Sequence, residues 1–499
     1  MTIAGLDIGT TGCKCTVFDE TGKELGKAYR DYPVTRGLSG HEIDVRALRL
    51  AVFEVIREMS GQHPDIGGIG VTSFGETFVM TDEEGEPLLP SMLYTDPRGK
   101  EECAELTKTL GEMHIARITG LRPHEMYGIS KMMWVRKNRP EIFEKTAYIF
   151  QMEDYIVFLL SGKRVIDYSL ATRSMAFDIH TLQYSEEILN EAGIGKELLS
   201  VPVPSGSKAG TVTEEASGKC GLPTSCLVVA VSQDQVAAAV GAGAFNGKVG
   251  VDGAGTVECL TPVYDEIPEI QPMYDGYFSV VPYVVPGKYV AYAFSYTGGA
   301  LIQWCVETLA KKEKEEATAL GISVNELLEQ RYREKRGDEP SGLLVLPHFA
   351  GAATPYMDTG SRGVIIGLTA DTEVSEIYRA CMEGVAYEML VNYRAVKKSG
   401  VHFDKLNATG GGAKSKEWMQ MKADILNVPI TALQTVDAGT VGSAMLTGIA
   451  AGIFRDLQDA ASHMVEETIT YVPDPSMHEK YMDVFGRYEK VYKAVRPLM

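Results

Sequence analysis

Two short apolar segments near the start of the chain, residues 2–4 and 15–18, enclose a stretch rich in glycine and threonine. β-Prone residues on both sides of such a stretch predict a hairpin with a tight turn. The same order recurs within residues 247–260, where Gly255-Thr256 separates two further apolar segments. Because one hairpin opens each half of the chain, the pattern indicates two duplicated domains, residues 1–245 and 246–499.

The rest of the chain alternates β-prone runs with longer helical patterns, which predicts an α/β fold. We expect further strands at residues 24–32, 66–73, 210–213, 226–231, 342–347, 364–366 and 406–408. We expect helices at residues 45–59, 236–243, 311–338, 376–397, 417–426, 437–452 and 477–495, and a mainly helical segment from 100 to 160. Residues 167–178 are polar and predict a loop.

The turn of the first hairpin is suited to binding an anion, because its glycines allow backbone N–H groups to approach a ligand closely. Thr10 and Thr11 add hydroxyl donors, and Lys14 adds a positive charge. Asp7, on the strand before the turn, is placed to hold a hydrated Mg²⁺ beside the same anion. An ordinary turn with a surface Asp contains the same residues, so this hairpin alone leaves both interpretations open.

Three carboxylates follow predicted strands, at the edge where ligands of α/β sheets collect. Glu76 and Asp96 are candidates for contacts with a ligand, although Glu76 also fits a loop carboxylate in solvent. Asp234 lies between a strand end and a helix start, where the helix dipole keeps a carboxylate ionised. Asp234 can therefore serve as a general base or as a helix cap, and the two roles are compatible.

Composition excludes several classes of partner. The 499 residues carry a net charge of −19 without a basic run, which argues against nucleic acid. No apolar run is long enough to cross a bilayer, and the N-terminus lacks the pattern of a signal peptide. The eight cysteines are scattered without zinc-ligand spacing. We therefore expect reduced, structural thiols in a cytoplasmic protein.

Taken in order, these segments resemble the FGGY carbohydrate kinases, a family of xylulokinases, glycerol kinases and gluconokinases. The resemblance is carried by Asp7-Ile-Gly-Thr-Thr11, Tyr94-Thr-Asp-Pro-Arg98, Lys131-Met-Met-Trp134, Gln233-Asp-Gln235, Gly255-Thr256, residues 363–383 and Gly410-Gly-Gly-Ala413. It covers nearly the whole chain. It implies two ribonuclease-H-like (actin-like ATPase) domains of α/β class with a cleft between them. The sugar would lie mostly on the first domain and ATP mostly on the second.

The resemblance also implies residue roles. Asp234 would take the proton from a sugar hydroxyl as that oxygen attacks the γ-phosphorus of ATP, and Asp7 would position Mg²⁺. The implied nucleotide-binding residues are Thr10, Thr11, Lys14, Gly255, Thr256, Gly299, Gln303, Gly411, Gly412 and Lys416. The implied substrate residues are Glu76, Asp96, Met126 and Gln235.

Departures from the family pattern bear on the substrate. Glycerol kinases have Gln-Arg-Glu-Thr where this chain has Phe74-Gly-Glu-Thr77, so their arginine is Gly75 here. Their tyrosine on the facing helix aligns with Met126. Losing the cation and the phenol opens space, so we expect a larger or differently shaped polyol, ketose or aldonate. The sequence leaves the oligomeric state open between a monomer and a homodimer.

Two other functions fit the same fold. An actin-like ATPase would use water as the acceptor and would turn over without sugar. A non-catalytic sugar sensor would bind sugar without transfer, but the retention of Asp7, Lys14, Asp234 and Thr256 argues against it.

Overall fold

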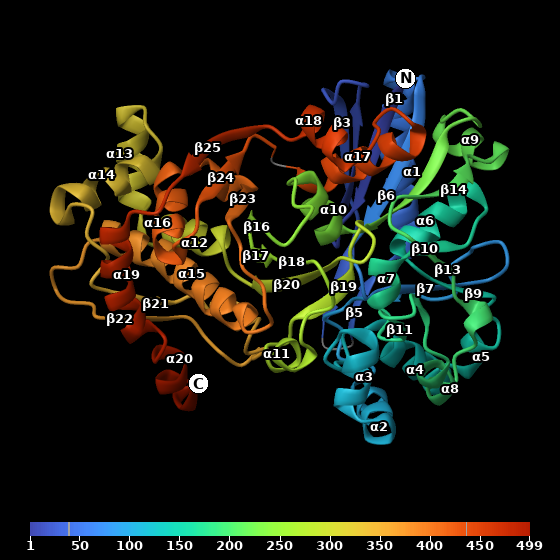
Figure 1. Ribbon diagram of the computed structural model, residues 1–499, viewed down its shortest axis with the longest axis horizontal. Coiled ribbons are helices and arrows are strands. Elements are labelled where there is room, and N and C mark those ends of the chain that lie inside the picture. The colour runs from blue at the N-terminus through green and yellow to red at the C-terminus, as the bar shows by residue number, and fades with distance from the viewer. Residues whose placement is uncertain (38–39, 436) are drawn as a thin grey trace.

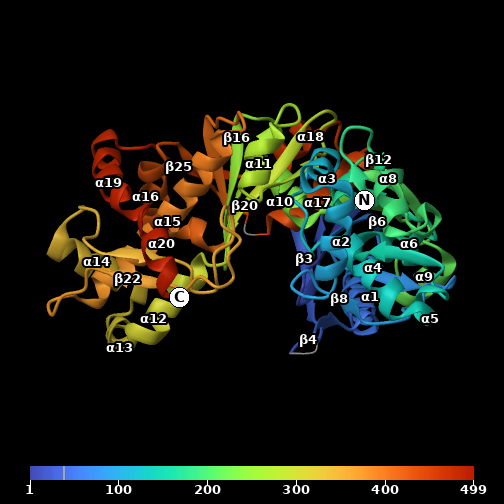
Figure 2. The ribbon, with the colours of Figure 1, turned by 90° about the horizontal axis from the view of Figure 1, so that it is seen from below.

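The computed structural model describes residues 1–37, 40–435 and 437–499. Two mixed sheets with helices on their faces form two lobes side by side (Figures 1 and 2). The first sheet has the order β14 (Ser207–Thr211), β15 (Leu227–Gln233), β6 (Ile66–Ser73), β1 (Thr2–Ile8), β2 (Gly12–Phe18), β3 (Glu24–Asp31). The predicted hairpin is confirmed, because β1 and β2 pair antiparallel.

The second sheet repeats this plan. Its main path has the order β18 (Val263–Tyr264), β20 (Tyr289–Ser295), β17 (Glu258–Thr261), β16 (Val249–Ala254), β23 (Lys405–Thr409), β24 (Ile430–Leu433), β25 (Glu467–Tyr471), and β19 (Ser279–Pro282) pairs with β20. In each sheet a hairpin (β1–β2 or β16–β17) is extended by an antiparallel strand on one side and two parallel strands on the other. Each sheet therefore has the ribonuclease-H-like strand order expected of two duplicated domains, while the boundary between residues 245 and 246 stays a prediction.

Crossovers between the parallel strands carry most of the helices. In the first half these are α1 (Val45–Gln62), α2 (Lys100–Leu110), α3 (Glu112–Thr119), α4 (Gly128–Asn138), α5 (Pro140–Phe143), α6 (Met152–Ser161), α7 (Tyr168–Thr172), α8 (Glu186–Ala192), α9 (Glu214–Cys220) and α10 (Asp234–Gly241). Short strands lie among them: β4 (Val34–Gly37), β5 (Gly40–Ile43), β7 (Phe78–Thr81), β8 (Ser91–Met92), β9 (Tyr148–Gln151), β10 (Val165–Asp167), β11 (Phe177–Asp178), β12 (Gln183–Tyr184) and β13 (Val201–Val203).

The helices of the second half are α11 (Ile270–Asp275), α12 (Gly299–Leu309), α13 (Lys311–Leu320), α14 (Val324–Arg336), α15 (Val374–Lys397), α16 (Lys416–Leu426), α17 (Ala438–Ala451), α18 (Leu457–Met464), α19 (Pro475–Tyr488) and α20 (Val491–Val495). The pair β21 (Leu344–Leu346) and β22 (Val364–Ile366) lies apart from the main sheet. Within the described residues, none of the helices combines the length and apolar composition that crossing a bilayer requires.

Three sequence expectations are wrong. The segment 167–178 is not a polar loop, because it contains α7 and its residues Asp167 and Arg173 are buried. Asp167 was misread because its carboxylate accepts the N–H groups of Ser169 and Leu170, which makes this polar residue a helix cap. Two segments expected as one helix each are two helices: 311–338 contains α13 and α14, and 477–495 contains α19 and α20.

Helix α17 comes from the second half of the chain but packs on the first sheet (Figure 1). Its residue Gly442 passes so close to α10 that a Cβ there would lie 1.9 Å from the carbonyl oxygen of Ala237. Only glycine permits this approach. Ser443 of α17 donates a hydrogen bond to the carbonyl of Gly70 on β6. This packing fixes the start of α17 beside the hairpin that opens the chain.

Candidate active site

Asp7 and Lys14 face each other across the first hairpin, and α17 begins beside them. Nζ of Lys14 lies 2.6 Å from Oδ1 of Asp437, which directly precedes α17. A Cβ at Gly439 would lie 3.2 Å from Oδ2 of Asp7, so the first turn of this helix passes close to that carboxylate. Burial raises the pKa of Asp7 to about 6, against the opposing effect of Lys14 and with a contribution from Asp437.

The side chains of the first hairpin leave polar atoms available for a ligand. The carboxylate of Asp7 and the hydroxyl of Thr10 make no hydrogen bond with the residues that the structure describes, whereas the Thr11 side chain contacts the Tyr29 hydroxyl. Tyr32 supports the turn from behind, since its hydroxyl donates to the carbonyls of Gly9 and Gly12. A carboxylate with a raised pKa suits a hydrated divalent cation, because the cation favours the ionised form.

Asp234 is the first residue of α10, at the end of β15. Its Oδ1 accepts hydrogen bonds from the side-chain amide of Gln233 and from the backbone N–H of Gln235. Its Oδ2 has no donor in the described part of the chain. Burial raises the pKa of Asp234 to about 8, and the carboxylates of Asp7 and Glu76 add to the effect. The charges of Asp7 and Glu76 are therefore close enough to Asp234 to affect its pKa.

Glu76 is buried and forms an ion pair with Arg173, whose Nε and Nη2 both reach Oε1. The φ angle of Glu76 is 65°, a left-handed backbone conformation that costs a residue with a side chain on the order of 1 kcal/mol. A loop carboxylate in solvent would be neither buried nor paired with a buried arginine, so that alternative is wrong.

The expectation that Gly75 leaves space and removes a cation is also wrong. A Cβ at Gly75 would lie 2.8 Å from Cγ of Arg173, so the Arg173 side chain fills the volume next to Gly75. An arginine from a different segment of the chain therefore lies against Gly75. Arg173 belongs to residues 167–173, a segment whose sequence pattern is shared across the family. Such a pattern does not reveal which residue the arginine side chain contacts.

The other predicted substrate residues have different surroundings. Both oxygens of Asp96 are occupied, since they accept from Arg98 and from the N–H of His41, and these bonds lower its pKa against the effect of burial. Asp96 thus resembles a structural carboxylate, and its role as a substrate ligand stays a prediction. Met126 and Gln235 are half-buried. Gln235 directly follows Asp234, which places it at the start of α10.

The predicted nucleotide residues gather at the turn of the second hairpin. The N–H of Gly299 donates to the carbonyl of Gly255, and the N–H groups of Gly298 and Ala300 donate to the carbonyl of Thr256. This turn therefore sits on the N-terminus of α12. Gly410 and Gly412 approach the end of β16 at Ala254.

Three further nucleotide residues lie at the surface near these turns. Gly411 has open space where a Cβ would stand, and Lys416 is exposed at the start of α16. Gln303 is exposed on α12, where its amide donates to Glu307. Direct hydrogen bonds thus connect Gly299 to Gly255 and the start of α12 to Thr256. Gln303 and Lys416 make no such bond in the described residues and lie nearby only because α12 and α16 begin at these turns.

The aspartate of the second hairpin does not match the aspartate of the first. Asp252 stands four residues before Thr256, whereas Asp7 stands three before Thr10. One residue of offset reverses the face of a strand. Asp252 is accordingly fully buried and paired with Lys422, whose Nζ lies 2.9 Å from Oδ2 and also contacts Glu258. This second carboxylate is part of the core and is occupied by a cation of the chain itself.

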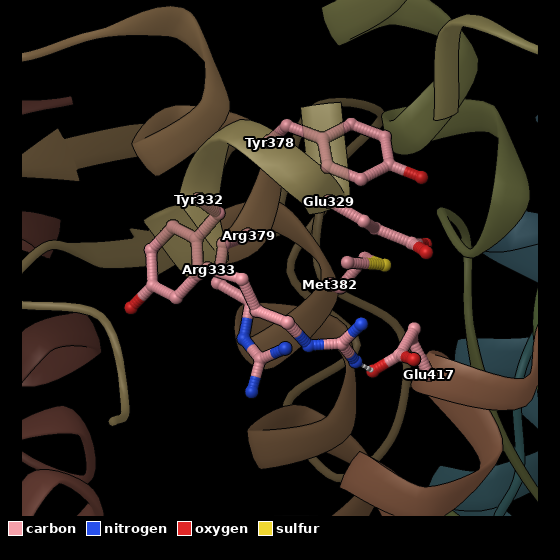
Figure 3. A pocket seen from close by; sticks show the side chains of 7 residues that line it. All are labelled: Glu329, Tyr332, Arg333, Tyr378, Arg379, Met382 and Glu417. Carbon is pink, nitrogen blue, oxygen red and sulfur yellow. Dashed lines mark ion pairs between the residues drawn. The ribbon is translucent and has the colours of Figure 1, made fainter. Parts of the chain in front are cut away.

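A small cavity lies elsewhere, between α14, α15 and α16 (Figure 3). Its volume of about 10 Å³ suits one water molecule and excludes a sugar or a nucleotide. Arg333 and Glu417 pair at one side of it. The candidate site is therefore not this cavity.

Comparison with known families separates the sugar kinases from other actin-like ATPases. Residues 2–241 match the N-terminal domain of the FGGY family of carbohydrate kinases, and residues 224–451 match the C-terminal domain of the same family. The chain belongs to the FGGY family of carbohydrate kinases. It is therefore an ATP-dependent carbohydrate kinase, a phosphotransferase that acts on an alcohol group.

Relatives of this FGGY kinase align along their whole length. Xylulose kinase from Lactococcus lactis is 27% identical, over 98% of this chain and 96% of that protein. Gluconokinase from Bacillus subtilis is 28% identical, over 96% and 93%. The solved structure of xylulose kinase from Rhodospirillum rubrum has a TM-score of 0.88 and 25% identity, over 100% of this chain and 99% of that one.

Three residues that contact or affect the predicted site residues escaped prediction from the sequence: Arg173, Asp437 and Tyr292. Arg173 follows α7 in the first half of the chain and Tyr292 lies on β20 of the second sheet, and each alters the pKa of the other. Asp437 reaches Lys14 across 423 residues of chain. A single sequence carries no signal for side-chain pairs at such separations, so the pairing could only come from the fold.

Proposed function

We propose that this FGGY kinase transfers the γ-phosphoryl group of ATP to a hydroxyl of a ketose, polyol or aldonate, with Asp234 as the general base. The observation that supports the proposal is the state of Asp234. One of its oxygens is held by Gln233 and Gln235, and the other has no donor within residues 1–37, 40–435 and 437–499. A fixed carboxylate with one unoccupied oxygen is the arrangement that proton abstraction needs.

In this proposal the first domain, residues 1–245, holds the sugar and the base, and the second, residues 246–499, holds most of the nucleotide across a cleft. Glu76 and Gln235 would accept and donate hydrogen bonds to sugar hydroxyls, which orients one hydroxyl toward Asp234. Thr10, Thr11 and Lys14 would bind phosphate oxygens from one side, and Gly255 and Thr256 from the other.

Mg²⁺ fits beside Asp7, because this carboxylate has no hydrogen-bond partner in the described residues and Mg²⁺ prefers oxygen ligands. When bound, the cation would neutralise phosphate charge as the phosphoryl group transfers. Asp7 would hold it through oxygen ligands and water. Lys14 would then exchange its contact with Asp437 for a phosphate oxygen. A homodimer and a cytoplasmic location stay predictions.

A screen of acceptors tests the function. We expect Mg·ATP to yield ADP rapidly with at least one member of a panel of five- and six-carbon ketoses, polyols and aldonates, and only slowly with water. Rates are measured by a coupled assay for ADP, with the panel at equal concentration. ADP release that is equally fast without any acceptor would refute the proposal and favour an ATPase.

A further inference from the structure

Arg173 occupies the centre of the candidate sugar site. Its side chain is 7% exposed, and its Nε and Nη2 are engaged by Glu76. The guanidinium carbon lies 5.1 Å from the ring centre of Tyr127 and 5.8 Å from that of Tyr292. Tyr127 belongs to the first half of the chain and Tyr292 to β20 of the second sheet, so Arg173 joins the two halves at this point.

Two buried polar groups of this cluster have no hydrogen-bond partner in the described part of the chain. These are Nη1 of Arg173 and the hydroxyl of Tyr292, which is 6% exposed as a residue. Leaving a buried donor unsatisfied costs about 1–3 kcal/mol, so most such groups in proteins are bonded. Arg173 and Tyr292 differ from other unsatisfied groups in lying close to each other, with the guanidinium carbon 5.8 Å from the Tyr292 ring centre, so one ligand oxygen could serve both donors.

The same two groups are coupled electrostatically to Asp234, the proposed general base. Asp234 affects the pKa of Tyr292, and Arg173 affects the pKa of Asp234. A ligand oxygen bound by Arg173 and Tyr292 would therefore belong to the molecule whose hydroxyl faces Asp234. Glu76, on the other side of the guanidinium, has its Oε1 occupied, which leaves Oε2 to accept from a neighbouring hydroxyl of that molecule.

The charges around this position decide which oxygen fits. The positive charge of Arg173 is already balanced by Glu76, and Asp234 in the ionised form that a general base needs adds negative charge nearby. A substrate carboxylate would be placed against these carboxylates, and like charges at close range cost several kcal/mol. A carbonyl or hydroxyl oxygen takes the two hydrogen bonds without that penalty.

We propose that Nη1 of Arg173 and the hydroxyl of Tyr292 donate hydrogen bonds to an uncharged oxygen of the substrate, so that the site selects neutral ketoses and polyols over aldonates. This inference rests on the proposed kinase function. Tyr292 is a contribution of the second half of the chain to sugar recognition, in addition to the residues of the first half.

Tyr292→Phe tests the hydrogen bond. The substitution removes one unpaired hydroxyl and keeps the ring, so the variant should fold with an unchanged or raised Tm. We expect the KM for the best neutral sugar to rise by about three- to tenfold, the worth of one neutral hydrogen bond. The matched control is Tyr387→Phe, because the Tyr387 hydroxyl on α15 is also buried without a partner in the described residues.

We expect Tyr387→Phe to leave the KM for sugar unchanged. Equal KM values for the neutral sugar in Tyr292→Phe and the wild-type enzyme would overturn the assignment of Tyr292. That result is expected if the Tyr292 hydroxyl does not contact the sugar. The KM for ATP serves as an internal reference in both variants and should not move.

The charge argument is tested with a ketose or polyol and an aldonate of equal carbon number. We expect kcat/KM to favour the neutral substrate by at least about tenfold. Glu76→Gln leaves the Arg173 charge unbalanced, so the ratio should shift toward the aldonate, whatever the fall in overall rate. An aldonate preferred by the wild-type enzyme would overturn this inference while leaving the kinase function intact, whereas no ADP with any acceptor would refute the function itself.

Discussion

Replacing Asp234 by Asn is expected to lower kcat for sugar phosphorylation by about 10²- to 10⁴-fold, the contribution of a positioned general base. Asn has nearly the same shape and can keep the bonds to Gln233 and Gln235, but it cannot accept the proton of the attacking hydroxyl. The binding of ATP should stay nearly intact, because Asp234 is assigned no nucleotide contact. The measurements are kcat by coupled ADP assay and the Kd of ATP by calorimetry.

The matched control for this substitution is Asp456→Asn. Asp456 is also an aspartate at a helix N-terminus, where it caps α18 by accepting the N–H of Asp459. Its loss should leave kcat unchanged and reduce stability only slightly. If Asp234→Asn keeps full turnover, or if both variants lose activity equally, Asp234 is not the base.

The pH profile of the wild-type enzyme gives an independent view of the same group. Burial and the carboxylates of Asp7 and Glu76 raise the pKa of Asp234 to about 8, and the base works only when ionised. We therefore expect kcat/KM for sugar to rise with pH along an acid limb. Mg²⁺ at Asp7 would shift the limb to lower pH, because a nearby cation favours the carboxylate. A rate that falls as pH rises from 6 to 8 would contradict the assignment.

Lys422→Met is expected to destabilise the second domain by about 3–5 kcal/mol, the usual cost of removing one partner from a buried ion pair. Lys422 is fully buried, and it contacts the carboxylates of Asp252 and Glu258 in the strands of the second hairpin. Burial and Asp252 hold the pKa of Glu258 well above its usual range. Without Lys422, Asp252 would be an unpaired buried charge.

Urea unfolding followed by tryptophan fluorescence measures this loss, since Lys422 lies 4.6 Å from the ring centre of Trp418. Adding Asp252→Asn should restore part of the stability, because the unpaired charge is then gone. The control is Lys219→Met on α9, whose pair with Glu215 is exposed and should matter by no more than about 0.5 kcal/mol. Equal effects of the two lysine substitutions would refute the buried triad as a structural element.

The hairpins and the central strands could be predicted from the sequence because each depends on local residues. The alternation of apolar segments with the Gly-Thr turns fixed strand and turn positions in both halves, and the duplicated strand order confirms that interpretation. A finer count along each hairpin would also have separated Asp7 from Asp252. Their distances to the Gly-Thr turn differ by one residue, which reverses the strand face.

The pairs that define the site could not be predicted, because they depend on how distant elements pack. Glu76 and Arg173 are 97 residues apart, and the volume beside Gly75 is filled from α7 rather than from its own strand end. The absence of a side chain at Gly75 therefore led to the wrong expectation of open space beside it. The roles of the nucleotide residues stay predictions that follow from the family.

The central claim is that an alcohol oxygen, activated by Asp234, receives the phosphoryl group. Phosphorus-31 NMR of a reaction with Mg·ATP and the preferred neutral sugar follows the fate of that group directly. We expect one equivalent of a phosphate ester per ADP formed, with inorganic phosphate at trace level. Inorganic phosphate appearing in step with ADP, with no ester signal, would contradict it.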